Sequence, residues 1–332
     1  MRKGQNPAKA INAVAQPQEV TVAIVTYIPF LSGYYAESLE VLKTCLGSIW
    51  ENTRDDYDLM VFDNASCQEV QSYLVDVRNS GRIQYLILSE KNIGKAGAWN
   101  ILFGGSPGKY IVYSDSDIYF YPGWLEAIIE ALETFPNVGM VTGMPMWSPE
   151  EFSTSSIEWA QKNSEVQLKH GKILSWEDYW KHSRSLGVTE ENARAHFDTC
   201  EEYKITIKDK SYYLGAGHFQ FAARRKVLQE ILPIPSKRPM GQVRLLDIAL
   251  NEREYLRLST NEWWVRHMGN TLPEDIPEEN FTKMGSPKDS ASTGENNHKY
   301  VSSRKLSIWN WRYIRKILQW LHGKTFDLLY RY

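Results

Sequence analysis

The feature that most constrains the fold of this chain is the alternation of two apolar patterns between residues 21 and 145. Five β-branched or aromatic runs are typical of buried strands: 21–26, 58–62, 83–88, 110–113 and 138–142. Apolar residues spaced three or four apart predict the helices between them: 39–49, 70–77, 96–102 and 122–135. This alternation predicts an α/β fold with a mostly parallel central sheet and helices on both faces.

Composition fits a soluble globular protein, with 42% hydrophobic and 23% charged residues among 332. A formal net charge of −2 gives no case for nucleic acid as the main partner. The three cysteines, Cys45, Cys67 and Cys200, have no C-x-x-C spacing and indicate reduced thiols of a cytosolic protein. Because we find neither a signal peptide in the polar first 20 residues nor an apolar run of about 20 residues, we expect a cytoplasmic protein.

The fourth predicted strand ends in two carboxylates, Asp115 and Asp117, which form an Asp-x-Asp motif. On an extended chain these positions project to the same side, so the two charges repel unless a cation or donors lie between them. A divalent ion bound together with a diphosphate would resolve the repulsion, because Mg²⁺ is usually held by one or two carboxylates and substrate phosphates. The alternative interpretation is a solvated turn with an Asx cap.

Polar residues also follow the ends of the neighbouring strands, where ligands bind in open α/β sheets. Asp63 is a candidate acceptor for a base N–H or a ribose hydroxyl. Asn92 and Gly94 lie where a helix starts, so backbone N–H groups and the helix dipole face whatever lies there. Each also fits a simple turn or helix entry. Their coincidence at one sheet edge favours a nucleotide site.

Four segments in this order and spacing resemble the nucleotide-binding half of inverting family 2 glycosyltransferases: Val25-Thr-Tyr27, Val61-Phe-Asp-Asn-Ala-Ser66, Asn92-Ile-Gly-Lys-Ala-Gly-Ala-Trp-Asn100 and Asp115-Ser-Asp117. The likeness spans residues 21–145 and continues more weakly through 215–221, 246–253 and 265–270. It implies a GT-A fold, a nucleoside diphosphate sugar as donor, and Mn²⁺ or Mg²⁺ as cofactor. By that match Asp63 binds the base, and the metal ligands are Asp115, Asp117 and His267. A lone histidine such as His267 is otherwise more often a core or surface residue.

Patterns and resemblance together give one set of predicted donor contacts: Thr26, Tyr27, Asp63, Asn92, Gly94, Lys95, Asn100, Ser114, Asp115 and Ser116. Asn100, within the helix, is expected to cap or orient the loop. Gly217 and His218 are expected at the acceptor, although a strand-end histidine without a role is the alternative.

The predicted catalytic base is Asp247. An inverting transfer needs a carboxylate that takes the proton of the acceptor hydroxyl. The family usually places it in a Glu-Asp-x-Asp pattern, of which Leu246-Asp-Ile-Ala249 keeps only Asp247. An ordinary surface acid is the alternative, but this acid lies within an apolar run.

We divide the chain into five parts: a flexible leader (1–19), a nucleotide-sugar-binding half (20–145), an acceptor-binding half (146–270), a mobile loop (271–298) and a basic amphipathic C-terminal helix (299–332). The helix has an apolar stripe that includes Ile308, Trp311 and Leu318. The first interpretation of that stripe is packing on its own domain or in a homodimer. The second is peripheral contact with the inner face of a membrane.

These observations predict a metal-dependent, inverting hexosyltransferase of polysaccharide or glycoconjugate biosynthesis that transfers a sugar to an acceptor hydroxyl. A sugar nucleotidyltransferase would need a Gly-rich basic loop after the first strand, and residues 27–35 do not form one. A non-catalytic nucleotide-sugar-binding protein would keep Asp63 and Asp115 without a base. The incomplete pattern around Asp247 leaves that rival open.

Overall fold

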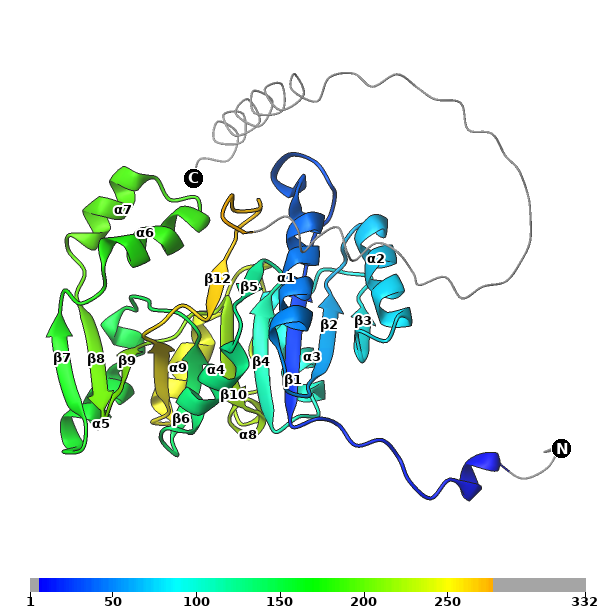
Figure 1. The fold of residues 1–332 in the computed structure, drawn as a ribbon, viewed down its shortest axis with the longest axis horizontal. Coiled ribbons are helices and arrows are strands. Elements are labelled where there is room, and N and C mark those ends of the chain that lie inside the picture. The colour runs from blue at the N-terminus through cyan, green and yellow to red at the C-terminus, as the bar shows by residue number, and fades with distance from the viewer. Residues whose placement is uncertain (1–5, 277–332) are drawn as a thin grey trace.

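The computed structural model describes residues 6–276 (Figure 1). Within them, ten strands form one sheet in the spatial order β3 (Tyr85–Leu88), β2 (Asp58–Asp63), β1 (Val20–Thr26), β4 (Tyr110–Asp115), β10 (Gln220–Arg224), β6 (Val138–Thr142), β11 (Leu256–Thr260), β9 (Lys210–Leu214), β8 (Glu202–Ile207) and β7 (Gln167–Gly171). A separate pair consists of β5 (Ile118–Phe120) and β12 (Val265–His267).

The described helices are α1 (Ser38–Asn52), α2 (Gln68–Asn79), α3 (Gly94–Gly105), α4 (Trp124–Glu133), α5 (Thr154–Lys162), α6 (Trp176–Ser185), α7 (Glu190–Phe197), α8 (Arg225–Gln229) and α9 (Arg244–Glu252). Short 3-10 helices occur at Pro7–Ala10, Gly33–Tyr35 and Glu150–Phe152. Figure 1 shows β1–β3 with α2 at one end of the sheet and β7–β9 with α6 and α7 at the other.

The strands β3, β2, β1 and β4 pair in parallel, which positions the site. In the registers, Thr26 lies beside Asp63, and Val25 lies beside Asp115. Because parallel strands in register end together, the polar residues after them meet at one edge of the sheet. The predicted α/β fold with a mostly parallel central sheet is confirmed.

The second half of the sheet is mixed. Strand β10 runs antiparallel between β4 and β6, β11 pairs in parallel with β6, and β9, β8 and β7 continue as an antiparallel meander. The sequence patterns indicate no strand in residues 149–203, where the structure has β7. The predicted division after residue 145 falls between β6 and α5, and both halves contribute strands to the same sheet.

Two apolar layers cover the sheet, as the side chains of β1 illustrate. Val22 and Ile24 face one layer, which contains residues of α1, α2 and α4. Ala23 and Val25 face the other layer, which contains Trp99 of α3 and residues of α9. Every residue of β1 is buried, as expected for a strand covered on both faces.

Predictions for the two ends of the chain fall mostly outside the described residues. Residues 8–19 are exposed, and they follow a 3-10 turn at Pro7–Ala10 into β1. Most of the predicted mobile loop (277–298) and the predicted C-terminal helix (299–332) lie outside the described residues. Among residues 6–276, no helix has both the length and the apolar character needed to cross a membrane.

Candidate active site

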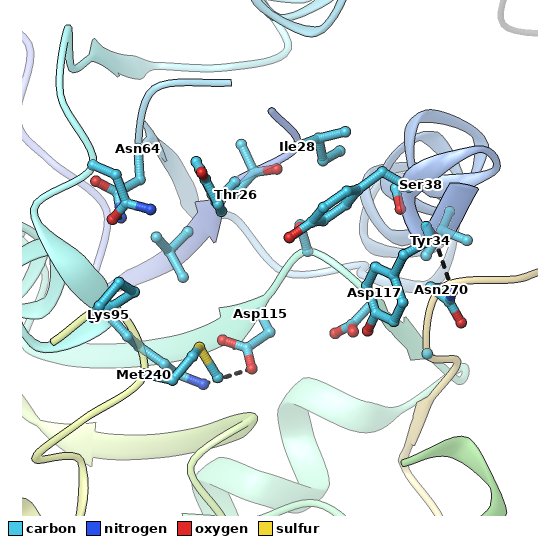
Figure 2. Close-up of a pocket in the computed structure, with 18 residues that line it drawn as sticks. Thr26, Ile28, Tyr34, Ser38, Asn64, Lys95, Asp115, Asp117, Met240 and Asn270 are labelled. Carbon is cyan, nitrogen blue, oxygen red and sulfur yellow. Dashed lines mark hydrogen bonds and ion pairs between the residues drawn. The ribbon is translucent and has the colours of Figure 1, made fainter. Parts of the chain in front are cut away.

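A cavity of about 340 Å³ lies outside the ends of β1, β2 and β4 (Figure 2). The predicted residues that line it are Thr26, Tyr27, Asn92, Lys95, Asp115, Ser116 and Asp117. Sequence patterns did not indicate several further lining residues: Tyr34, Tyr35, Ser38, Asn64, Pro239, Met240, Gly269 and Asn270. We call this space the donor cavity.

Asp115, at the end of β4, has partners on both carboxylate oxygens. Its Oδ2 lies 2.6 Å from Lys95 Nζ, and its Oδ1 accepts a hydrogen bond of 2.5 Å from the Tyr113 hydroxyl. Burial, reinforced by the Asp115 carboxylate, raises the pKa of Tyr113 well above its usual value, so the phenol stays a donor. Figure 2 shows Lys95 and Asp115 pointing toward one another across the cavity wall.

Asp117 has a different partner, because β12 pairs with β5 and places His267 beside Ile118. The Asp117 Oδ2 atom lies 3.3 Å from His267 Nε2, and Ser185 Oγ lies 3.0 Å from His267 Nδ1, which orients the ring. Burial raises the pKa of Asp117, an effect that His267 opposes. Its Oδ1 is buried and has no hydrogen-bond partner among residues 6–276.

The three predicted metal ligands are therefore only partly assembled. Asp117 and His267 meet, while Asp115 turns to Lys95 and Tyr113. Within the described residues, no group of three His, Cys, Asp or Glu side chains converges as a metal site. The buried, unpartnered carboxylate oxygen beside an imidazole nitrogen still fits Mn²⁺ or Mg²⁺ if phosphate oxygens supply other ligands.

Asp63 does not line the donor cavity. Its carboxylate is fully buried and accepts the Ser66 N–H at 3.2 Å and the Gln71 amide at 3.1 Å, which closes the turn after β2. The next residue, Asn64, lines the cavity instead. Its Oδ1 accepts the Ile93 N–H at 2.9 Å. Consecutive residues of an extended strand point to opposite sides, so the position predicted for Asp63 falls on Asn64.

The sequence predicted free backbone N–H groups at the start of α3, but the structure gives the first two of them partners within the protein. The Gly94 N–H is bonded to Asn92 Oδ1 at 2.8 Å, and the Lys95 N–H to Pro239 O at 2.8 Å. The side chain of Asn92, the residue before the N-cap Ile93, thus occupies the first N–H of the helix, and a loop at 236–240 covers the first turn.

Three other predicted donor contacts also support the cavity from behind. Asn100 binds the backbone of Ile234 in both directions, at 2.7 and 2.8 Å. The Ser114 hydroxyl is buried and donates to Asp115 O at 2.7 Å. Gly94 packs under Ser236. None of the three lines the donor cavity.

A second cavity, of about 650 Å³, adjoins the first, and Lys95, Asp115 and Met240 line both. Its apolar wall consists of Pro145, Met146, Trp147, Leu174, Tyr179, Leu186, Val188, Ala193, Ala216, Phe219 and Val243. Gly217, His218 and His267 line it as well, so both predicted acceptor contacts lie here. We call this space the acceptor cavity.

Asp247, in the first turn of α9, has no exposed surface and lines neither cavity. Its Oδ1 lies 2.8 Å from Nη2 of the buried Arg257. Its Oδ2 lies 2.8 Å from His218 Nε2 and 3.8 Å from Arg244 Nη1. The contact with His218 has the distance of an ion pair but not the angles of a regular hydrogen bond. From the sequence, the Asp247 carboxylate was expected to contact the acceptor hydroxyl directly. The structure places the His218 ring beside the carboxylate and in the acceptor cavity.

Comparison with known sequences gives one family match: the sequence model described as "Glycosyl transferase family 2" matches residues 33–231, more than half of the chain. A protein named "Uncharacterized glycosyltransferase" from Rickettsia bellii is 30% identical over 86 residues, which are 26% of this chain and 12% of that protein. An uncharacterized glycosyltransferase of Nostoc sp. is 22% identical over 100 residues, covering 30% of this chain and 31% of that protein. The chain thus spans less than a third of either relative.

Solved structures show a more distant likeness. The mannosyltransferase PcManGT from Pyrobaculum calidifontis, in complex with GDP-Man and Mn²⁺, is 16% identical, with a TM-score of 0.42 over 75% of this chain and 55% of that chain. GalNAc-T7, with UDP, GalNAc and Mn²⁺, is 11% identical, with a TM-score of 0.45 over 76% of this chain and 45% of that chain.

Proposed function

The chain belongs to glycosyl transferase family 2, and we propose that it transfers a sugar from a nucleoside diphosphate donor to an acceptor hydroxyl with inversion. The observation that carries the proposal is the pair of adjoining cavities at the end of the parallel strands, which share Lys95, Asp115 and Met240. A donor in one cavity and an acceptor in the other would meet beside these shared residues. The sheet is the GT-A arrangement that the family resemblance implied, with a parallel nucleotide-binding half joined through β10 to a mixed second half.

The donor cavity supplies groups for each part of a nucleotide. Tyr27 and Asn64 lie at the strand ends and offer a ring and an amide to the base and ribose. Lys95 carries a positive charge at the border of the two cavities, where the diphosphate would lie. Asp117 and His267 would hold the divalent cation, which stabilises charge on the leaving diphosphate when bound.

The acceptor cavity supplies a mainly apolar floor and a proton acceptor. Single displacement with inversion needs a base opposite the leaving group. We propose that the pair formed by His218 and Asp247 provides it, because it is a buried acid–imidazole contact that reaches the acceptor cavity. A hexosyl group and an acceptor of polysaccharide or glycoconjugate type complete the proposal.

A non-catalytic nucleotide-sugar-binding protein is the second candidate, and the burial of Asp247 favours it. Such a protein would bind the donor without turning it over. The cytoplasmic location stays a prediction. So does the membrane or dimer contact of residues 299–332, which lie outside the described residues.

The test is a donor screen in two steps. UDP-, GDP- and dTDP-sugars with Mn²⁺ are first ranked by thermal shift, where ligand at 100 times its Kd adds about 2.7 kcal/mol of stability. The best donor is then incubated with the protein, and release of the nucleoside diphosphate is measured together with the anomeric configuration of the product. Stabilisation without release would favour the binding protein, and absence of stabilisation by every donor would refute a donor site. A product of retained configuration would refute inversion.

A further inference from the structure

Two side chains that line the acceptor cavity lie beside the Asp247 carboxylate: the His218 ring at 2.8 Å from Oδ2 and Arg244 at 3.8 Å from the same atom. Of the two, only the imidazole can accept a proton, because an arginine side chain stays protonated. Asp247 is fully buried, whereas the His218 side chain keeps 17% of its surface exposed and lines the cavity. The carboxylate is also held from behind, because Arg257 contacts its Oδ1 and donates to Ala216 O at 2.6 Å. A hydroxyl in the cavity therefore reaches the imidazole first.

We propose that His218 takes the proton of the acceptor hydroxyl and that Asp247 is a positioning residue, an assignment that rests on the proposed function. His218 Nε2 faces Asp247, which leaves Nδ1 as the nitrogen available to the cavity. Because Nε2 lies 2.8 Å from a carboxylate oxygen, a neutral ring that carries its proton on Nε2 avoids placing two acceptors side by side. That tautomer leaves Nδ1 unprotonated, and this nitrogen is the base.

On the acceptor side, His218 and Asp247 are enough to account for every bond and proton in the transfer. The acceptor O–H bond breaks as its oxygen bonds to the anomeric carbon, and the proton moves to His218 Nδ1. The bond from the anomeric carbon to the diphosphate oxygen breaks, and its electron pair leaves with the diphosphate. The imidazolium that forms is stabilised by Asp247, whose charge lies 2.8 Å from Nε2.

The charges around His218 keep it neutral before the reaction. Burial is the largest influence and lowers its pKa, Asp247 raises it, and Arg257 and Lys95 lower it further. The net shift is downward, so the ring is unprotonated at neutral pH and can accept a proton. Activity carried by the neutral ring is lost as the pH falls through this lowered pKa.

Asp247→Asn then separates the two roles. Removing the group that raises the pKa of His218 moves the acid limb of the pH–rate profile to lower pH and lowers the rate, because the imidazolium loses its counter-charge. If Asp247 were itself the base, the acid limb would disappear instead of shifting, and the proposal would fail.

The experiment compares the turnover of His218→Gln with that of His170→Ala in the full chain. The donor is the nucleotide sugar that most stabilises the wild type in the thermal-shift screen, and the acceptor is water or a sugar. His170 is the control because it is a half-exposed histidine, stacked on Tyr203 and outside both cavities. Loss of a general base costs about 10²–10⁴-fold in turnover, so we expect this loss in His218→Gln and none in His170→Ala. Donor-induced stabilisation should be unchanged in both variants, and imidazole in solution should restore part of the turnover of His218→Ala.

Nuclear magnetic resonance of the histidine ring nitrogens gives a second test that needs no substrate. The signals of His218, assigned by their loss in His218→Gln, should show a neutral ring protonated at Nε2 at neutral pH. Protonation at Nδ1 would overturn the proposal even for an active enzyme. Wild-type turnover by His218→Gln would overturn it while leaving the proposed function standing, whereas a wild type that turns over no donor would overturn both.

Discussion

Replacing Gly94 with alanine tests whether the loop at 236–240 and the start of α3 form one rigid wall of the donor cavity. Gly94 has φ of +76°, and a Cβ built on it would lie 2.8 Å from Ser236 Oγ and 2.9 Å from Arg238 O. One of these atoms is backbone and cannot rotate away. The adjacent N–H of Lys95 is bonded to Pro239 O, so relief of the contact must move the loop.

The cost can be divided into two parts. A left-handed conformation costs a residue with a Cβ roughly 1–2 kcal/mol. Overpacking against the loop adds about 1–3 kcal/mol. Gly94→Ala should therefore lose about 2–5 kcal/mol of unfolding free energy. Because Pro239 and Met240 line the donor cavity, the same shift should weaken donor binding.

Gly187 provides the matched control, since it has the same φ of +76° but no atom within 4 Å of the place where a Cβ would lie. Gly187→Ala should lose only the backbone part, about 1–2 kcal/mol, and keep the wild-type donor affinity. Urea unfolding gives the stability of both variants, and calorimetry with the best panel donor and Mn²⁺ gives the affinity. Equal losses of stability in the two variants, with donor affinity unchanged in both, would refute the rigid wall.

Three further predictions concern charged side chains. Arg257→Met removes the cation beside Oδ1 of the buried Asp247 and leaves only His218 and the more distant Arg244 near its Oδ2, so it should cost about 3–5 kcal/mol in urea unfolding. Adding Asp247→Asn to that variant should recover part of the loss, and no recovery would show that packing dominates. Asp117→Asn should abolish the stabilisation that Mn²⁺ adds in the presence of UDP, and EDTA should abolish wild-type activity; full activity in EDTA would exclude the metal site. Asp63→Ala should lose about 1–3 kcal/mol of stability with unchanged donor affinity, while Asn64→Ala should weaken the donor in calorimetry, and the reverse pattern would restore Asp63 as the base contact.

The parallel half of the fold could be predicted because its pattern is local. Each of the strands β1, β2 and β4 contains a run of apolar residues, and the helix α1 that follows β1 has apolar residues that recur every three or four positions. Strand β7 gives no such pattern, because its five residues include a lysine and a histidine and are only partly buried. It becomes a strand through pairing with β8, which depends on residues about 35 positions further along the chain.

The sequence motifs lead to the sheet edge where the two cavities lie, and the differences between predicted and observed side-chain positions have physical causes. Motif order places polar groups at this edge, but it could not tell that Asp63 points into the turn while Asn64 lines the cavity. The buried Asp247 of α9 is paired with Arg257, a cation in strand β11 whose apolar neighbours gave no sign of an ion pair. Likewise, the N–H of Lys95 at the start of α3 is bonded to Pro239 O, a partner far away in the sequence that the local pattern could not indicate.

The motif that first indicated a metal also shows how the chain tolerates two neighbouring carboxylates. Repulsion between Asp115 and Asp117 is relieved by giving each a partner from a different element: Lys95 from α3 for the first, and the His267 ring from β12 for the second. A donor diphosphate would compete for Lys95, and a divalent cation would compete for the pair of Asp117 and His267. A diphosphate that takes Lys95 leaves the Asp115 carboxylate without its cation, and a divalent cation bound nearby would compensate for that loss. Diphosphate and cation should therefore bind better together than either alone. This coupling follows from charge balance across the two pairs and needs no movement of the sheet.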